Sequence, residues 1–537
     1  MNQLLSENPL LLLFIVAALG YLIGTIKVKG ASLGVAAVLF VGLGFGMINP
    51  EYNVPEIIFQ LGLVFFVYSI GLSSGPVFFE SFKKNGYRDL AFVLVMLTIT
   101  ASSAVLIHYL FGFDKAMTVG LYSGSTTNTT ALAAVTDLIK SNTKSQLESL
   151  VVGYTFSYPM GVIGVMIVLK ISEKVLKIDY AAEMKVLRKS YPLDTELSSR
   201  SILVTNQDIL HITVRDIMRS NDWNVIISRV KTGEDMRLVN WDTTFHIGDA
   251  MMMVGSKEDL DKAQMYFGEE ANDAMYTERK EYDIQQIFVS NTALVGQTIA
   301  SLNLNAKHDA IITRIRRGDV EMLAQQDTVL ELGDRIRFIA KRKDLKELSK
   351  LFGDSYFESS TVNLFSFGLG MALGLLLGFI SISLPGGLEF KLGLAGGPLV
   401  MGLFLGSLRR TGPIVWTLPY SANVTLRQLG LILLLSVVGL QSGNSFLDAL
   451  NKVDGLYIFL AGTMLSMFSA FVAVMIGYKL FKIPFSMLLG FMSNQPAILE
   501  FATDMAKNRA PVIGYALMFP IALIMKILFA QILYLVL

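Results

Sequence analysis

Two short polar runs interrupt otherwise apolar stretches of this 537-residue chain. The first consists of hydroxyl, amide and glycine residues: Ser123, Gly124, Ser125, Thr126, Thr127, Asn128 and Thr129. The second is Ser493, Asn494, Gln495 and Pro496. An unpaired polar group costs several kcal/mol in lipid, so both runs must line a cavity or pack against protein. Such donors can hold a carboxylate by hydrogen bonds, but they include no nucleophile–base pair for catalysis.

A helix that starts directly after each run would add the free N–H groups of its first turn and the positive end of its dipole. Anions bind at such helix N-termini, and Pro496 suits a first helical turn. We therefore expect the two runs to form one site for a small anionic or zwitterionic carboxylate. The competing interpretation is that the Ser and Thr residues only bridge neighbouring helices.

A second pair of matched motifs ends the third apolar segment of each half of the chain. Ser73-Ser74-Gly75-Pro76 stands in the first half and Gln441-Ser442-Gly443-Asn444 in the second. Two interpretations are open, a helix end that water reaches or a further wall of the site. The candidate wall residues are Ser74, Gly75, Ser442 and Gly443.

Lys526 lies well inside the last apolar stretch of the chain. An unpaired Lys at that depth costs about 2.5–3.5 kcal/mol on insertion scales. Three roles are open: it binds an anionic substrate as part of the wall, it pairs with Glu500 or Asp504, or it extends to the membrane surface.

The polar runs occupy matching places in a duplicated sequence. Residues 60–75 align with residues 428–443 at an offset of 368, and 8 of the 16 positions are identical. Gly153-Tyr154 likewise returns as Gly514-Tyr515. Two related hydrophobic halves are typical of secondary transporters, which bind substrate at the repeat interface. Four glycines of the aligned segments are expected to allow close helix packing: Gly62, Gly71, Gly430 and Gly439.

The composition indicates a membrane protein. Hydrophobic residues make up 53% of the chain and charged residues 17%, whereas a soluble protein carries about 25% charge. The net charge of +1 argues against nucleic-acid binding, which needs a basic surface. The lack of cysteine excludes disulfides and thiolate chemistry. We expect no cofactor, no metal, no catalytic residues and a retained N-terminal span.

The chain divides into a transmembrane half at 1–172, a linker at 173–199, a charged block at 200–354 and a second transmembrane half at 355–537. The first half has apolar segments near 8–26, 32–48, 56–73, 88–111, 114–136 and 148–170. The second has them near 361–383, 392–408, 426–442, 454–478, 484–503 and 511–537. The polar runs interrupt the fifth segment of each half.

Basic residues predict the topology by the positive-inside rule. If both interrupted segments return to the side from which they entered, the charged block and every basic cluster face the cytoplasm. These clusters are Lys27/Lys29, Lys83/Lys84/Arg88, Arg409/Arg410, Lys479/Lys482 and Lys507/Arg509. The favoured fold class is an α-helical polytopic membrane protein built as an inverted repeat, with about five spans plus one re-entrant or broken helix per half. Two discontinuous helices that cross one another are the alternative.

The charged block is a tandem repeat with an offset of 85 residues. Asn206, Arg229, Gly233, Asp242-Thr243 and Gly248-Asp249 reappear as Asn291, Arg314, Gly318, Asp327-Thr328 and Gly333-Asp334. Strand, turn, strand and helix in each copy predict two small α+β domains, at 200–283 and 284–354. The Gly-Asp pairs are expected to form turns. No dinucleotide or P-loop fingerprint is present.

The repeated pattern of these domains resembles the RCK C-terminal (TrkA-C) domain, which implies a small regulatory ligand. The whole chain resembles the aspartate–alanine exchanger family of bacterial secondary transporters, whose signature is G-x-x-S-G-x-x-T-x-T. The match is Gly120, Ser123, Gly124, Thr127 and Thr129. The family often continues with Pro-Ala-Leu where this chain has Thr130-Ala131-Leu132, so the pocket and the substrate could differ.

The resemblance implies a homodimeric, multi-pass transporter of the bacterial inner membrane with its TrkA-C domains in the cytoplasm. It implies exchange of small carboxylates or amino acids, of the aspartate/alanine or dicarboxylate type, by an elevator-like movement. The expected partners are that substrate, the lipid bilayer, a second copy of the chain and the regulatory ligand. A TrkA-C-gated ion channel and an ion-coupled symporter are the alternatives.

Overall fold

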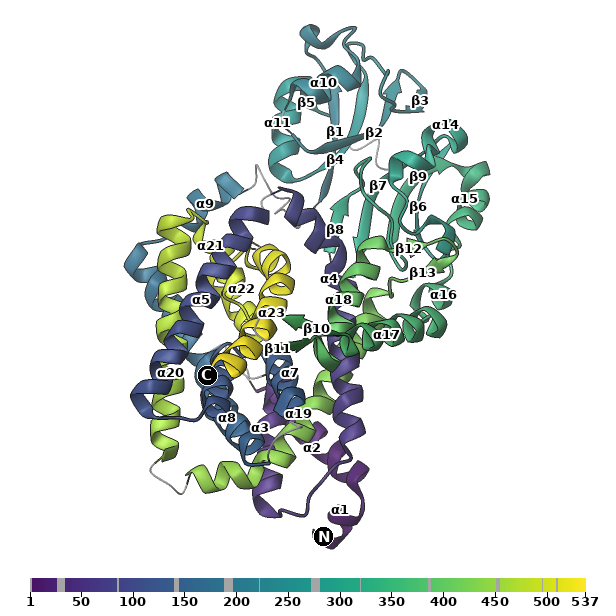
Figure 1. Cartoon of the computed structure of the whole chain (residues 1–537). Coiled ribbons are helices and arrows are strands. Elements are labelled where there is room, and N and C mark those ends of the chain that lie inside the picture. Colours follow the sequence, from purple (N-terminus) through teal and green to yellow (C-terminus); the bar gives the residue numbers. More distant parts are fainter. Residues whose placement is uncertain are drawn as a thin grey trace. The chain divides into compact units, whose positions relative to one another are not determined.

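The computed structural model describes residues 2–26, 34–84, 86–139, 144–187, 197–221, 223–271, 281–318, 320–384, 388–450, 454–494, 496–508 and 510–537. The chain forms two compact units (Figure 1). The helical unit comprises Met1–Leu193, Leu364–Leu408 and Asn423–Leu537, and the α+β unit comprises Asp194–Asn363 and Arg409–Ala422.

The helical unit contains two sets of helices in the same order. The first set is α1 (Asn2–Glu7), α2 (Pro9–Gly24), α3 (Ala37–Ile48), α4 (Glu56–Lys84), α5 (Gly86–Phe111), α6 (Lys115–Ser125), α7 (Thr129–Ile139), α8 (Lys144–Leu176) and α9 (Tyr180–Leu187). The second is α17 (Leu364–Phe379), α18 (Gly393–Leu408), α19 (Tyr420–Leu450), α20 (Asp454–Met475), α21 (Phe485–Phe491), α22 (Pro496–Ala506) and α23 (Ala510–Val536). Breaks fall at both polar runs, between α6 and α7 and between α21 and α22.

Length and apolar composition make this a helical membrane protein. Within the described residues, six helices are long and apolar enough to cross a bilayer, or seven if the bent pair Ala510–Phe519 and Ile521–Val536 forms one span. Pro9–Gly24, Ala37–Ile48 and Gly393–Leu408 are shorter apolar helices. The expectation of two membrane halves separated by an α+β block is confirmed.

Glycines bring helices of the two halves into backbone contact. A Cβ on Gly71 of α4 would lie 2.6 Å from the Leu399 carbonyl oxygen of α18, and one on Gly439 of α19 would lie 2.5 Å from the Leu39 carbonyl oxygen of α3. Gly62 meets α19 in the same way, since its Cβ would lie 2.8 Å from a backbone oxygen. The expected close packing at these glycines is confirmed.

The apolar spans Glu56–Pro76 and Tyr420–Gln441 end at the Ser-Gly motifs, as expected, but the helices themselves do not end there. Both motifs lie inside continuous helices, α4 and α19, which extend to Lys84 and Leu450. Serine is compatible with a helix interior because its hydroxyl can bond to its own backbone. Ser73 Oγ donates to the Ser69 and Ile70 carbonyl oxygens, each at 3.1 Å.

The α+β unit contains two antiparallel sheets. The first has the order β3 (Asp235–Leu238), β2 (Val225–Thr232), β4 (Ala250–Gly255), β1 (Ser198–Val204) and β5 (Gly268–Glu270). The second has the matching order β8 (Val320–Leu323), β7 (Ala310–Arg317), β9 (Arg335–Lys341) and β6 (Tyr282–Phe288). A register shift at Ile227/Arg229 recurs at Ile312/Arg314. Each sheet has its own apolar core, completed by α11 (Lys257–Phe267) or α15 (Leu345–Phe352).

The Gly-Asp pairs form turns in both copies, as expected. Gly248 and Gly333 have φ of 87° and 86°, a conformation that favours glycine. The buried carboxylates of Asp249 and Asp334 accept backbone N–H bonds three residues upstream, from His246 at 2.9 Å and Glu331 at 2.8 Å.

A hairpin from the second membrane half completes the α+β unit, and no pattern in the sequence pointed to it. β12 (Arg410–Thr411) pairs with β13 (Ile414–Val415). Arg409 lies 3.6 Å from the Glu331 carboxylate, and Arg410 Nη1 donates to the Ala293 carbonyl oxygen at 2.7 Å. Burial raises the pKa of the Glu331 carboxyl, against the opposing charges of Arg317 and Arg409.

Candidate functional site

The first polar run closes the end of α6. The Thr127 N–H donates to the Gly124 carbonyl oxygen at 2.9 Å, and the Asn128 N–H donates to that of Ser123 at 2.8 Å. This bonding pattern is a Schellman cap, whose left-handed position usually holds glycine. Here Thr127 occupies it with φ of 47°. A β-branched residue is strained in this region, and such strain is concentrated at functional sites.

α6 lies alongside the first half of α8, and both helices run in the same direction. A Cβ on Gly153 would lie 2.5 Å from the Met117 carbonyl oxygen, and one on Gly161 would lie 2.8 Å from Thr127 Cγ2. The chain therefore advances from Met117 to Thr127 as α8 advances from Gly153 to Gly161.

α7 turns back toward the start of α8. Residues 140–143 alone join Ile139 to Lys144, and a connection of that length spans at most about 18 Å. If α7 continued in the direction of α6, its end would lie far along α8 from Lys144. At a helical rise of about 1.5 Å per residue, that distance would be about 40 Å. α6 and α7 are therefore the arms of a hairpin whose tip is the first polar run.

α21 and α22 repeat this arrangement beside α23. A Cβ on Gly490 would lie 2.0 Å from the Pro511 carbonyl oxygen, just as one on Gly120 would lie 2.1 Å from that of Leu150. Residues 507–509 alone join α22 to α23, so α22 must also turn back. The tip of this second hairpin is the second polar run.

Lys526 of α23 connects the two tips. Its Nζ donates to the Thr126 carbonyl oxygen at 3.3 Å and also to Asn494 Oδ1. Thr126 ends α6, so the ammonium group faces the negative end of that helix dipole. The residue is 7% exposed, so the interpretation that Lys526 extends to the surface was wrong.

The alternative that Lys526 pairs with an acidic residue finds no support among the described side chains. Asp504 is exposed and forms no ion pair with Lys526, and the side chain of Glu500 lies outside the described set. Among the described side chains, two neutral oxygens and no carboxylate therefore hold the amine of Lys526.

The first tip also holds polar atoms without a partner. Residues 123–130 are all buried. Within the described chain, the Ser123 hydroxyl, the Thr127 hydroxyl and the Asn128 Nδ2 have no hydrogen-bond partner. Buried polar groups are normally paired, so three orphans at one tip mark a place where a polar ligand could bind. The Asn128 Oδ1 is already used, because it accepts the Ala131 N–H at 3.1 Å as the cap of α7.

The other predicted residues of the first run are bonded to protein. Ser125 Oγ donates to the Gly462 carbonyl oxygen at 3.4 Å, and Thr126 Oγ1 donates to that of Tyr122 at 2.9 Å. The hydroxyls of Thr129 and Tyr154 are 2.8 Å apart. Tyr154 was not a predicted site residue, although its recurrence as Tyr515 was a usable signal.

The second tip is less completely described. Ser493 lies just after α21, and its Oγ donates to the Leu489 carbonyl oxygen of that helix at 2.6 Å. Pro496 starts α22 as predicted, and Gln495 lies outside the described residues. Of this run, Asn494 is the residue that the structure brings to Lys526.

The candidate wall residues lie in the long helices. Gly75 packs on α18, where its Cβ would lie 2.3 Å from the Leu403 carbonyl oxygen, and Gly443 packs on Gly46 of α3. These contacts assign both glycines to helix packing. Ser74 is half-buried in α4, and the side chain of Ser442 lies outside the described set.

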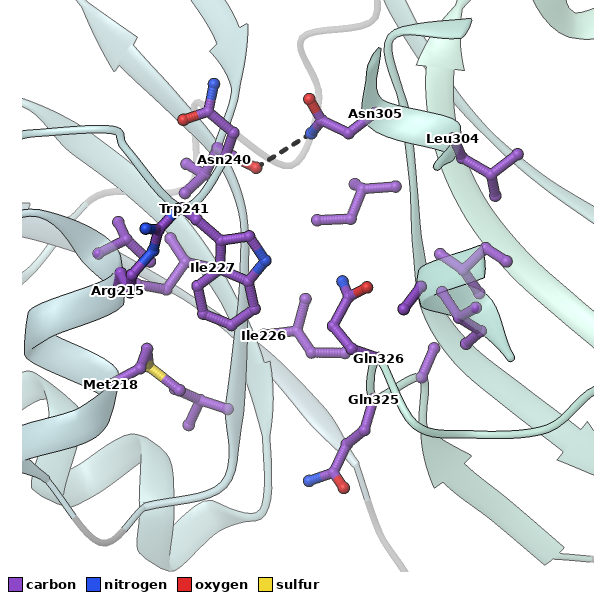
Figure 2. A pocket seen from close by; sticks show the side chains of 18 of the residues that line it. Arg215, Met218, Ile226, Ile227, Asn240, Trp241, Leu304, Asn305, Gln325 and Gln326 are labelled. Atoms are coloured by element: carbon purple, nitrogen blue, oxygen red, sulfur yellow. Dashed lines mark hydrogen bonds between the residues drawn. The ribbon is translucent and has the colours of Figure 1, made fainter. Parts of the chain in front are cut away.

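A separate cavity of about 840 Å³ lies between the two sheets of the α+β unit (Figure 2). Residues 225–227 and 239–242 line it, and so do their counterparts 85 positions later, 310–312 and 324–327. The two copies therefore contribute the same elements to the cavity.

The cavity departs from this symmetry at a few positions. Trp241, which is 44% exposed, points into it opposite Gln326, its counterpart in the other copy (Figure 2). Arg215 corresponds to Ala300 in the same way. The side of the first copy thus adds an aromatic ring and the ion pair of Arg215 with Asp242, whose atoms are 3.0 Å apart, and Asn305 and the Gln side chains supply amides around the cavity. In the described part of the chain, no three His, Asp or Glu side chains gather to hold a metal ion.

Comparison with known proteins identifies the helical unit and the second domain of the α+β unit. The family model described as "Predicted Permease Membrane Region" (Asp-Al_Ex) matches residues 12–174 and 366–535. The TrkA-C domain model matches residues 285–353. No solved structure matches.

Full-length relatives carry the name of uncharacterized transporters. One from Geobacter sulfurreducens is 44% identical over 541 residues, with 99% of each chain covered. One from Symbiobacterium thermophilum is 39% identical with 99% of each chain covered, and one from Bacteroides fragilis is 32% identical with 97% covered. The chain is therefore a membrane transporter and not an enzyme, and it belongs to the Asp-Al_Ex permease family with a TrkA-C domain.

Proposed function

We propose that this transporter exchanges small anionic or zwitterionic carboxylates, of the aspartate/alanine or dicarboxylate type, at the point where the two hairpin tips meet. One observation carries the proposal: Lys526 is a buried basic side chain whose amine donates to both tips. An ammonium group held by neutral oxygens attracts a carboxylate strongly in a low-dielectric surrounding. A substrate carboxylate would replace Asn494 Oδ1 or the Thr126 carbonyl oxygen as its partner.

The orphan donors complete this site. The Ser123 and Thr127 hydroxyls and the Asn128 amide could donate to a carboxylate or to a second polar group of the substrate. α7 and α22 both begin at the tips, so the positive ends of their dipoles face the same point. The arrangement binds one or two carboxylates without requiring a sodium or proton partner, which favours exchange over ion-coupled symport.

The connectivity supports an inverted repeat with five spans and one re-entrant hairpin per half. The loop between α18 and α19 and the segment between α9 and α17 belong to one compact unit, so both lie on one side of the membrane. With five crossings per half, the first hairpin enters from the opposite side and the second from the side of the α+β unit. In this arrangement the basic clusters would face the same side as the α+β unit, which supports a cytoplasmic position for that side by the positive-inside rule. Lys27, Lys29 and Arg509 of these clusters lie outside the described residues.

Alternating access would follow from movement of both hairpins with α8 and α23. Lys526 travels with the tips because it lies on α23. The helices joined by the glycine contacts, α3, α4, α18 and α19, would form the fixed scaffold and the homodimer interface. Movement of this kind carries the site between two sides of a barrier, in an elevator-like manner.

Counterflow into liposomes tests the transport proposal. Purified protein is reconstituted with unlabelled L-aspartate, L-alanine or succinate inside, and uptake of the labelled solute is followed. We expect uptake only when a carboxylate solute is present on both sides. The absence of counterflow for every solute would overturn the proposal. Steady single-channel currents would instead favour the ion-channel alternative.

For the α+β unit, we infer that the cavity between its sheets binds a small regulatory ligand. The half-exposed Trp241 and the surrounding amides support this inference, because an aromatic face with hydrogen-bonding groups suits a planar polar molecule. A metabolite screen by thermal shift of the whole protein tests it. A hit should be lost in Trp241→Leu and kept in Ile247→Ala, an exposed apolar control outside the cavity lining. A hit that survives Trp241→Leu contradicts the assignment.

A further inference from the structure

The two hairpins differ in how their first arm begins. Asp114 precedes α6, and its carboxylate accepts the Met117 N–H at 2.8 Å, as an N-cap does. The aligned position of the second hairpin is Pro484, at the offset of 370 that also relates Gly120 to Gly490. Pro484 has no side-chain oxygen and makes no cap. The second hairpin therefore lacks a cap of its own.

Glu183 of α9 supplies the cap that the second hairpin lacks. Its carboxylate accepts the Phe485 N–H at 2.7 Å, the Ser486 N–H at 2.9 Å and the Ser486 hydroxyl at 2.5 Å. Phe485 and Ser486 are fully buried, and Glu183 is the partner that the structure gives to these donors. Charge-assisted bonds of this kind are stronger than neutral ones.

Apolar contacts fix α9 against the same arm. The Tyr180 and Phe485 rings lie 6.4 Å apart between centroids. Met184 and Leu187 pack in the cluster that contains Met487 and Leu488 of α21. α9 is also the last helix before the α+β unit, since residues 188–196 lead from it to β1. The first hairpin is thus capped from within, and the second is capped by the segment that enters the α+β unit.

We propose that Glu183 is a positioning residue for the transport cycle, which holds α21 in place and thereby sets the Asn494 tip against Lys526. The proposal rests on the proposed function for its role in exchange. Its structural part, the capping of α21 by a distant helix, stands independently. Glu183 touches no substrate, so it should affect turnover more than substrate affinity.

Amide hydrogen exchange tests the structural part and needs no substrate. In Glu183→Ala, we expect the amides of residues 485–494 to exchange about tenfold faster, as loss of an N-cap implies. Residues 115–126 of the first hairpin are the internal control and should be unchanged. The double variant Glu183→Ala/Pro484→Asp should regain protection, because the introduced aspartate would then cap α21 as Asp114 caps α6. Wild-type protection in Glu183→Ala would overturn the proposal.

Exchange kinetics in liposomes test the functional part. We expect Glu183→Ala to lower turnover about tenfold while KM stays within about twofold, and the double variant to recover turnover. Glu183→Gln keeps one acceptor oxygen and should lie between wild type and Glu183→Ala, which provides a milder variant if Glu183→Ala folds poorly. Restored protection without restored turnover would overturn the positioning role. If the wild type exchanges no solute, the proposed function fails, and amide exchange alone decides the role of Glu183.

Discussion

Replacing Lys526 by Met distinguishes two roles of this residue: a ligand of the substrate, or a structural clamp that only holds the two hairpin tips together. Met has a similar length and no charge, so the variant removes the ammonium group and little volume. Burying an unpaired Lys mid-membrane costs about 2.5–3.5 kcal/mol, and each of its two bonds to Thr126 and Asn494 returns about 1.5–3 kcal/mol. Together the two bonds return about 3–6 kcal/mol, which exceeds the burial cost by about 1.5 kcal/mol at mid-range, so we expect the melting temperature in nanodiscs to fall by less than about 5 °C.

The effect of Lys526→Met on transport should be much larger. A substrate carboxylate would lose one charge-assisted bond, worth about 1.5–3 kcal/mol, which corresponds to about a 10- to 150-fold weaker affinity. The assay is the KM for counterflow of the best solute in liposomes. Gln531→Leu is the matched control, because Gln531 is another buried polar residue of α23. An unchanged KM in Lys526→Met would refute the role of Lys526 as a substrate ligand. A large loss of stability would identify it as a clamp.

Three further substitutions test other parts of the structure. Thr127→Gly should raise the melting temperature, because glycine removes the left-handed strain of about 1 kcal/mol, and should raise the KM for exchange about 2- to 12-fold, because an orphan hydroxyl is lost. Gly490→Ala should destabilise the protein by about 1–3 kcal/mol through overlap with the Pro511 carbonyl oxygen, whereas Gly44→Ala should be nearly neutral in thermal unfolding, because nothing lies within 4 Å of its Cβ. Arg409→Ala should make the α+β unit unfold at lower temperature in limited proteolysis, because Glu331 loses a partner.

Much of the membrane fold follows from the sequence because its signals are local. Runs of apolar residues located most helices to within a few positions, although α4 and α19 extend well beyond the expected segments 56–73 and 426–442. The two polar runs located both breaks. The apolar spans of the third segments end near Gly75 and Gly443 as expected, but the interpretation of these motifs as helix ends was wrong for a physical reason. A serine in a helix can satisfy its own hydroxyl, so a polar motif by itself does not mark a helix end.

The contacts that depend on distant residues were not predictable in this way. Lys526 contacts Thr126 and Asn494, which lie far from it in the chain. The sequence alone did not decide among the three interpretations of Lys526. The capping of α21 by Glu183 could not be predicted either, because no periodic pattern in the sequence links Glu183 to Phe485. Residues 409–422 contain two arginines, glycine and proline and resemble a surface loop, although they form part of the α+β unit.

The hairpin at residues 409–422 bears on the order in which the protein is made. The ribosome completes residues 194–363 before it has synthesised α17 and α18, yet the α+β unit also contains Arg409–Ala422. Its final folding step must therefore wait until that helical pair has left the exit tunnel and entered the bilayer. A nascent chain released before this point would keep Glu331 buried beside Arg317 without Arg409. Because the α+β unit closes late, its folding depends on successful membrane insertion, so quality control could recognise chains whose insertion has failed.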